Sequence, residues 1–359
     1  MKARDLYASD YFDARQRFLA AARMHNAWTA AFPITARGPK GEELTIDTAY
    51  LGAGAPRRLL VVSSGTHGVE GYAGTAVQIA FLKQLTARML RKDQGVLLVH
   101  ALNPYGYAHN RRTNEHNVDL NRNALEHFPG PANPAYARLN RWLNPPSPPG
   151  ADLFVLRGLG YLLSQGPAAV KQAIAGGQYE FPKGIFYGGT ALAESTRRFA
   201  DILGDASFKS AQRVVYIDLH TGLGRRGGYK VLVDFEERSE PYARMREWFG
   251  AKAVQGNRPK RSIAYRVTGN LTDLAGRLFR GAEVYPAVLE FGTYSLVHMI
   301  GALRAENRAH FYGKRGSARA TRARDALIET FCPRAAAWRS AIVRGGLRVL
   351  NQALAALGR

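Results

Sequence analysis

Two short segments, far apart in the chain, carry residues that could hold a metal ion. Residues 66–70 read Thr-His-Gly-Val-Glu and supply His67 and Glu70, and residues 218–222 read Asp-Leu-His-Thr-Gly and supply His220. Two histidines and one carboxylate form the ligand set of a catalytic zinc ion, which keeps a fourth position open for water. These residues predict one zinc ion per chain, and therefore an enzyme.

The segments around these residues indicate how they are brought together. Apolar runs at 58–64 and 213–218 lie next to the two histidine segments and have the pattern of buried strands in a mostly parallel sheet. Asn103 follows a further run of this kind at 95–101, and Glu290 lies near the end of another at 287–291. Ligands bind beyond the carboxyl ends of the strands in an open α/β sheet, so we expect these two residues to lie near the histidines.

Strand and helix patterns alternate along the whole chain. This alternation predicts an α/β fold with a mixed, mostly parallel central sheet and helices on both faces. The run at 43–52 has the alternating polarity of an edge strand. The predicted helices lie at 12–28 and 74–89, and the predicted strands lie at 43–52, 58–64, 95–101, 213–218, 229–234 and 287–291.

A single catalytic domain is expected over residues 1–359. The proline-rich stretch at 128–178 interrupts the pattern and predicts an irregular, lid-like excursion. Residues 318–359 are rich in alanine and arginine, and their periodicity predicts basic helices packed on the outside of the sheet.

The composition narrows the class of protein. No apolar stretch is long enough to span a membrane, and the N-terminus lacks the apolar core of a secretory signal, so we expect a cytoplasmic location. The single cysteine, Cys332, excludes an intramolecular disulfide and a cysteine-ligated zinc site. No histidine or asparagine motif surrounds this cysteine, so a catalytic thiol is not favoured.

The formal net charge of +22 would attract acidic substrates. A simpler explanation of this charge is an arginine-rich composition in which most of the charged side chains lie on solvated faces. The basic residues are spread along the chain, with a local rise from Lys314 to Arg324, and they form no RNA-binding signature. Neither a specific nucleic-acid partner nor a membrane is expected, and the sequence does not indicate an oligomeric state.

Several motifs resemble, in order and content, those of the zinc carboxypeptidase superfamily, and most closely those of a bacterial branch of unknown function. The resemblance extends over residues 59–294. Its motifs are S-G-T-H-G-V-E-G at 64–71, V-D-L-N-R-N at 118–123, L-H-T-G at 219–222 and E-F-G-T at 290–293. It implies that His67, Glu70 and His220 are the zinc ligands.

The resemblance also implies roles for residues around the metal. Asp119 matches the carboxylate that holds the far ring nitrogen of the first ligand histidine, with a turn cap as the ordinary alternative. Glu290 matches the general base, against which stands a structural ion pair with an arginine. Arg112 is favoured as the group that stabilises the oxyanion, and Arg111 is kept as a second candidate beside the substrate.

Further matches concern the substrate. Asn121 and Arg122 match the pair that binds the terminal carboxylate, for which the planar guanidinium is well suited. Tyr265 matches a mobile tyrosine that closes over the substrate, although it could equally be a surface residue. Thr272 matches a position in the specificity pocket, and its small polar side chain predicts neither a basic nor a large apolar preference.

The resemblance thus implies a zinc-dependent, metallocarboxypeptidase-like hydrolase that cleaves a peptide or amide bond next to a free carboxylate. Its substrate would be a small peptide or an N-acyl amino acid. One alternative is an aspartoacylase-like or succinylglutamate desuccinylase-like deacylase of small N-acyl amino acids. Another is a non-catalytic protein that keeps the fold and binds an anion. The spacing from Tyr265 to Glu290 is longer than in the digestive enzymes, and residues 128–178 have no counterpart there.

Overall fold

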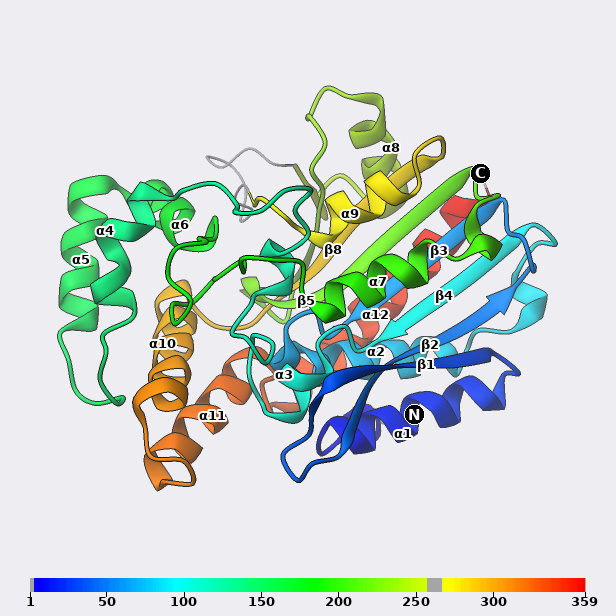
Figure 1. The fold of residues 1–359 in the computed structure, drawn as a ribbon. Helices are drawn as coiled ribbons and strands as arrows, with labels where there is room; N and C mark the ends of the chain where they lie inside the picture. The colour runs from blue at the N-terminus through cyan, green and yellow to red at the C-terminus, as the bar shows by residue number, and fades with distance from the viewer. Residues whose placement is uncertain (1–2, 257–266, 359) are drawn as a thin grey trace.

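The computed structural model describes residues 3–256 and 267–358. In this part of the chain, eight strands form one sheet in the order β1-β2-β4-β3-β5-β8-β6-β7 (Figure 1). The neighbours β4-β3, β3-β5, β5-β8 and β6-β7 run parallel, and the other pairs are antiparallel. The strands are β1 (Trp28–Arg37), β2 (Glu43–Gly52), β3 (Arg58–Ser64), β4 (Gln94–His100), β5 (Arg213–Arg226), β6 (Tyr229–Leu232), β7 (Val254–Gln255) and β8 (Glu283–Gly292).

Helices cover both faces of this sheet, which confirms the predicted α/β fold class. In the two described ranges, none of the helices combines the length and the apolar character needed to cross a membrane. The helices are α1 (Tyr11–Met24), α2 (Gly71–Leu82), α3 (Pro104–Ala108), α4 (Pro134–Leu143), α5 (Phe154–Gln165), α6 (Pro167–Ala175), α7 (Glu194–Leu203), α8 (Glu240–Phe249), α9 (Leu271–Leu278), α10 (Leu296–Tyr312), α11 (Ala318–Phe331) and α12 (Ala336–Leu357).

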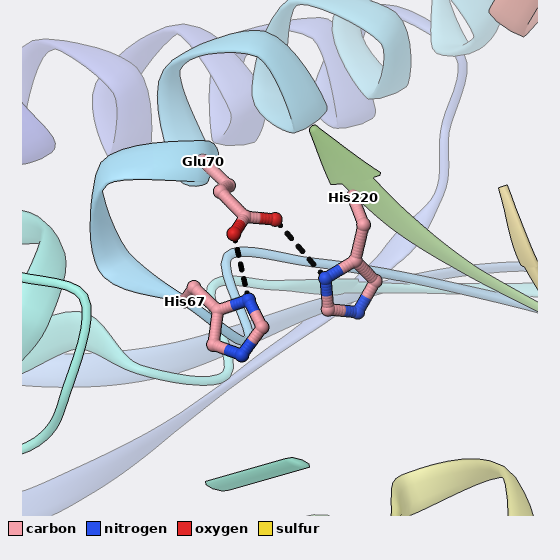
Figure 2. Close-up of side chains that lie close together, drawn as sticks. All are labelled: His67, Glu70 and His220. Carbon is pink, nitrogen blue, oxygen red and sulfur yellow. Dashed lines mark hydrogen bonds and ion pairs between the residues drawn. The ribbon is translucent and has the colours of Figure 1, made fainter. Parts of the chain in front are cut away.

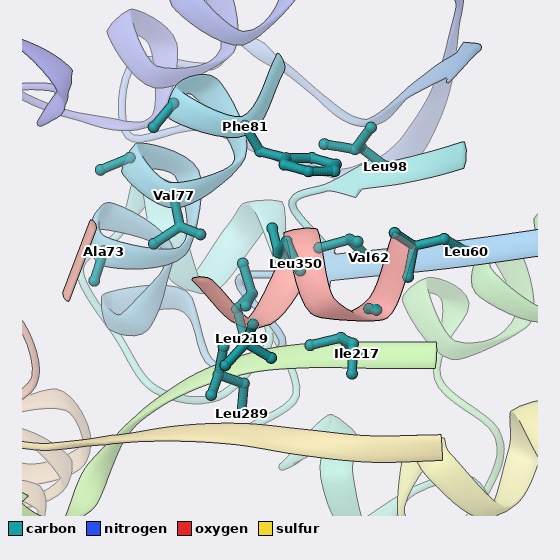
Figure 3. Packing of buried hydrophobic residues seen from close by; sticks show 14 of the residues in the cluster. Leu60, Val62, Ala73, Val77, Phe81, Leu98, Ile217, Leu219, Leu289 and Leu350 are labelled. Carbon is teal, nitrogen blue, oxygen red and sulfur yellow. The ribbon is translucent and has the colours of Figure 1, made fainter. Parts of the chain in front are cut away.

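Neighbouring residues of the central strands point to opposite faces, as the pleat of a strand requires. In β3, Leu60 and Val62 face α2 and α12 (Figure 3), in a cluster that α1 also joins. Leu59 and Val61 point to the other face, where they belong to a cluster with residues of α7 and α9. The core therefore has three layers. The C-terminal helix α12 belongs to it, because Leu350 is fully buried against the first face.

A third apolar cluster lies beside the sheet and joins α4 and α6 to α10 and α11. The prediction of an irregular excursion at 128–178 is wrong, because three helices, α4, α5 and α6, form within it. The sequence-based expectation treated the prolines as breakers. Two of them, Pro134 and Pro167, instead start helices, where the missing N–H costs nothing.

Three further predictions about elements are wrong. The helix predicted at 12–28 ends at Met24, and Asn26 turns the chain with a φ of 54° into β1. Because β1 pairs with β2, the strand at 43–52 lies inside the sheet rather than at its edge. The helix predicted at 74–89 ends at Leu82. The edge strand β1 was missed because most of its side chains are exposed and it contains Pro33, so it shows no buried face.

Candidate metal centre and active site

Three strands place the candidate site at the carboxyl edge of the sheet. In β5, His220 is paired directly with Glu290 of the parallel strand β8. On the other side of β5, Ser63 of β3 is paired with Asp218, and the turn that follows β3 carries His67. The register of the sheet thus brings together residues that lie far apart in the sequence, and all of them are buried.

Glycines allow the turn after β3 to fold tightly. Gly65 has a φ of 67°, a conformation that favours glycine. At Gly68, an added Cβ would lie 1.9 Å from the backbone carbon of Gly106, so no other residue fits there. The short 3-10 helix Gly68–Glu70 then turns the Glu70 carboxylate back toward His67.

The three candidate ligands lie side by side (Figure 2). The two carboxylate oxygens of Glu70 lie 2.7 Å from His67 Nδ1 and 3.0 Å from His220 Nδ1. The three possible ligand atoms lie within 4.8 Å of one another. Two imidazole nitrogens and a carboxylate, gathered in a buried site, fit a zinc ion.

The far nitrogens of both histidines face carboxylates. His67 Nε2 lies 3.0 Å from Asp119 Oδ1, and His220 Nε2 lies 2.6 Å from Asp218 Oδ2. A carboxylate in this place fixes the tautomer of a metal-binding histidine and makes it a stronger ligand. The contacts on both rings therefore also fit a metal held on the Nδ1 side.

The role of Asp218 was not inferred from the sequence. Its signal is the Asp-Leu-His spacing, because residues two apart in a strand point to the same face. The Ser63 hydroxyl donates to Asp218 Oδ1 at 2.6 Å, and the Thr66 hydroxyl lies 3.0 Å from both carboxylate oxygens. Asp218 is therefore held rigidly behind His220.

The structure separates the two arginines that the sequence left open. Arg112 lines the cavity in front of the histidines, and it donates to Glu70 Oε1 and Asp119 Oδ2, both at 3.1 Å. Arg111 points elsewhere, because its guanidinium donates to Glu306 at 2.8 Å and to Asn117 at 3.1 Å. These contacts favour Arg112 over Arg111 beside the substrate.

The carboxylates of the site have opposite electrostatic environments. Burial raises the pKa of Asp119, but the charges of Arg112, Arg122 and His67 outweigh burial and hold it well below its usual range. In Glu290, burial raises the pKa to about 7, and the charge of Glu70 adds to this effect. A carboxyl group with a pKa near neutrality is suited to accept and return a proton.

The structure places Asn121 and Arg122, the two residues predicted to bind the substrate carboxylate, in different surroundings. Asn121 lines the cavity, and its side-chain carbonyl accepts from Leu271 N at 3.1 Å, so its amide nitrogen remains to donate to a ligand. Arg122 is fully buried, and its guanidinium donates to the carbonyls of Ala175, at 2.6 and 3.2 Å, and Asn121, at 2.8 Å. Among the described residues that line the cavity, Arg122 is not present, and its described contacts turn it toward the backbone. Its predicted binding of the substrate carboxylate stays a prediction that these contacts do not support.

Two other expected residues, Asn103 and Thr272, can be placed in the structure. Asn103 lies outside the cavity wall as described, where it caps α3 through Gly106 N and donates to the carbonyl of Arg112 at 3.2 Å. It thus holds the loop that carries Arg112. Thr272 lines the cavity, and its hydroxyl donates to Asn270. Tyr265 lies outside the described residues.

A cavity of about 470 Å³ opens in front of the candidate metal cluster, which consists of His67, Glu70 and His220. Glu290 lines it and is held by Leu223 N, which donates to Oε1 at 2.7 Å. The helical part of the wall is mostly apolar and comes from α6, α10 and the end of α11. Its members include Ile174, Leu296, Met299, Ile300, Leu303 and Phe331, with Lys171 among them.

This sheet, with the cluster at its carboxyl edge, defines a protein of zinc carboxypeptidase-like fold. The structure is similar to carboxypeptidase A from Helicoverpa armigera, with a TM-score of 0.51 and 12% identity over 98% of this chain and 75% of that one. It also matches a metallo-carboxypeptidase from Burkholderia cenocepacia (TM-score 0.42, 14% identity, 92% and 68% covered). A third match is the succinylglutamate desuccinylase from Chromobacterium violaceum (TM-score 0.39, 16% identity, 89% and 74% covered).

At such identities a structural likeness concerns the fold, and the predicted resemblance is confirmed at that level. Among curated proteins, none matches the sequence significantly. The chain belongs to the family described as "Protein of unknown function (DUF2817)", whose family model matches residues 7–345.

Proposed function

We propose that the protein is a zinc-dependent hydrolase that cleaves a peptide or amide bond next to a free carboxylate. The observation that carries this proposal is the joint presence of the His67, Glu70 and His220 cluster and of Glu290 on one cavity wall. A protein that only bound anions would have no use for a buried carboxylate with a raised pKa beside such a cluster.

Zinc held by His67, Glu70 and His220 would supply Lewis acidity to the substrate carbonyl and to an attacking water. Glu290 would take the proton of that water and return it to the leaving nitrogen. Its Oε1 is occupied by Leu223 N, so Oε2 is the atom that exchanges the proton. Asp119 and Asp218 would keep both histidines in the tautomer that leaves Nδ1 free to bind the metal.

Arg112 would stabilise the negative charge that develops on the carbonyl oxygen. Its contacts with Glu70 and Asp119 fix the guanidinium before any substrate arrives, so little reorganisation is needed during reaction. Asn121 would donate from its amide nitrogen to a polar group of the substrate, because its carbonyl is already bound to Leu271.

The decisive experiment combines metal analysis with the variant Glu290→Gln. Wild type should hold one zinc per chain and hydrolyse members of a panel of short peptides and N-acyl amino acids. The variant should keep the zinc and lose about 10²- to 10⁴-fold in kcat, the usual contribution of a general base. Glu283→Gln, on the exposed amino end of the same strand, is the matched control and should retain full activity.

The panel also separates the neighbouring functions. Turnover of N-acyl amino acids alone would assign a deacylase, and turnover of peptides alone would assign a carboxypeptidase. Full activity in the Glu290→Gln protein, or the absence of stoichiometric zinc in active wild type, would overturn the proposed mechanism. Anion binding with no turnover of any panel member would favour a binding protein.

A further inference from the structure

We infer that Lys171 binds the free carboxylate of the substrate, and that Ile174 and α10 receive a large apolar side chain next to it. The substrate class is then an N-acyl amino acid or short peptide with a large apolar carboxyl-terminal residue. This inference rests on the proposed function for the position of the cleaved bond. The binding subsite itself can be tested without turnover.

The first step concerns the charges that reach the cavity. Of the lysine and arginine side chains that the structure describes, Arg112 and Lys171 line it. Arg112 is bonded to Glu70 and Asp119 beside the metal cluster. Arg122 donates to two backbone carbonyls behind the cavity wall. Among the described residues, Lys171 is therefore the second cationic side chain that a carboxylate in the cavity can meet.

The second step concerns the helix that presents this lysine. Lys171 and Ile174 are three residues apart in α6, so they lie on the same face of the helix, and both line the cavity. Lys171 is half-buried, and burial lowers the pKa of its amine while the charge of Glu290 raises it. A partly desolvated ammonium attracts a carboxylate more strongly than a fully hydrated one does.

The third step concerns the apolar wall around the lysine. Ile174 packs in one cluster with Met299, Ile300 and Leu303 of α10, and all four also face the cavity. Such a wall gains free energy by covering apolar surface, and a small side chain would leave it uncovered. The acidic residue Asp234 follows β6 and belongs to the part of the wall that the sheet forms, not to this helical part.

The position of α6 also gives a reason for the helices of residues 128–178. This stretch has no counterpart in the motifs that the chain shares with the carboxypeptidases, yet its last helix supplies a charged and an apolar residue to the cavity. The guanidinium of Arg122 donates to the carbonyl of Ala175 at the end of α6 and so does not face the cavity. Lys171 of the same helix would replace the positive charge that Arg122 does not supply there.

A binding experiment tests the inference on zinc-loaded Glu290→Gln protein, which should not turn the ligands over. Isothermal titration calorimetry would compare N-acetyl-L-phenylalanine with its carboxamide. We expect the acid to bind about tenfold more tightly or better, as a hydrogen bond to a charged group implies. Adding Lys171→Met should remove this preference, and adding Lys171→Arg should keep it.

Lys183→Met is the matched control, because Lys183 is exposed and stacks on Phe311 outside the cavity. It should leave the preference intact. N-acetylglycine should bind about tenfold or more weakly than N-acetyl-L-phenylalanine, because it leaves the apolar wall uncovered. Preference for the acid that survives Lys171→Met would overturn the assignment of the lysine. Equal binding of N-acetylglycine would overturn that of the apolar wall.

The two levels of the proposal fail in different ways. If wild type hydrolyses neither these compounds nor peptides, the proposed function is overturned. A carboxylate preference that depends on Lys171 would still establish the subsite in that case. Conversely, hydrolysis that is equally fast for wild type and Lys171→Met would keep the proposed function and overturn the subsite.

Discussion

Asp218 illustrates how the proposed metal site depends on residues behind its candidate ligands. Its Oδ2 faces His220 Nε2 at 2.6 Å, while Ser63 and Thr66 donate to the carboxylate from the other side. Neutral imidazole carries one proton. A carboxylate that accepts it at Nε2 leaves Nδ1 as the lone pair that faces the metal position.

The variant Asp218→Asn should therefore weaken zinc binding about 10- to 100-fold, the usual cost of removing such a partner. An amide nitrogen turned toward Nε2 would favour the wrong tautomer of His220. Competition with a chelator of known affinity would measure the change. The control is Asp47→Asn, a buried carboxylate paired with Arg15 at 2.8 Å, which should lower stability and leave zinc affinity unchanged. Equal zinc affinity in both variants would contradict the role of Asp218.

His100 illustrates a different kind of buried histidine. It is fully buried and stacks on Phe18 with ring centroids 4.8 Å apart, but in the described structure neither ring nitrogen has a hydrogen-bond partner. Burial lowers the pKa of His100 to about 3. The folded protein therefore holds this ring neutral.

This pKa predicts a loss of stability in acid. The ordinary pKa of histidine, about 6.5, applies to the unfolded chain, which takes up a proton as the pH falls below that value, whereas folded His100 does not until about pH 3. Protonation thus favours the unfolded state, by about 3 kcal/mol between pH 7 and pH 4. Urea unfolding at both pH values should show that the free energy of unfolding of His100→Phe falls by about 3 kcal/mol less than that of wild type. The exposed His116→Phe should behave as wild type, and equal acid sensitivity of all three proteins would refute the prediction.

At the residue scale, the sequence could predict which side chains gather but not how each is turned. His67, Glu70 and His220 lie together because the motifs follow paired strands. The orientation of Arg122 depends on the carbonyl of Ala175, and that of Arg111 depends on Glu306, far away in the chain. Partners of this kind are supplied by tertiary packing, which single motifs do not contain.

Among the elements, the short helix Gly68–Glu70 positions the Glu70 carboxylate beside His67 in the candidate metal cluster. Gly68 lies against Gly106 at the start of α3 so closely that an added Cβ would meet its backbone at 1.9 Å. Backbone cannot move aside as a flexible side chain can. Gly68→Ala should therefore cost about 3 kcal/mol or more of the free energy of unfolding, at the upper end of overpacking effects.

Gly276→Ala is the informative control for this substitution. Gly276 lies inside α9 with open space where its Cβ would be, so alanine should stabilise the protein by about 0.5–1 kcal/mol. Thermal or urea unfolding of the two variants should give changes of opposite sign. A Gly68→Ala protein as stable as wild type would show that the turn and α3 are less closely packed than the structure indicates.

The elements that could be predicted from the sequence were mainly the buried ones. The strands at 58–64 and 213–218 were found because continuous apolar runs mark them, although β5 extends further, to Arg226. The edge strand β1 and the three helices of residues 128–178 were missed. In β1 most side chains are exposed, and in the helices the prolines that start them were interpreted as breakers. These elements take their place from neighbours rather than from a strong pattern of their own.

For the whole molecule, the most general property is its charge. The formal net charge is +22, spread over a surface of 16001 Å². At the cavity, Arg112 and Lys171 add positive charge to that of the proposed metal ion. The local contacts and the overall field therefore favour the same substrate, one with a negative charge, and they differ in how far salt weakens them.

The salt dependence of catalysis separates these two contributions. The Debye length is about 30 Å at 0.01 M salt and about 8 Å at 0.15 M, so a field summed over the surface acts on a substrate at the lower concentration only. We expect kcat/KM for an anionic N-acyl amino acid to fall several-fold between these conditions, and that for its uncharged carboxamide to stay nearly constant. Lys171→Met should lower kcat/KM for the acid at both concentrations yet retain most of the salt dependence, because the distant charges remain. If salt affected the acid and the carboxamide equally, the net charge of the chain would have no part in selecting the substrate.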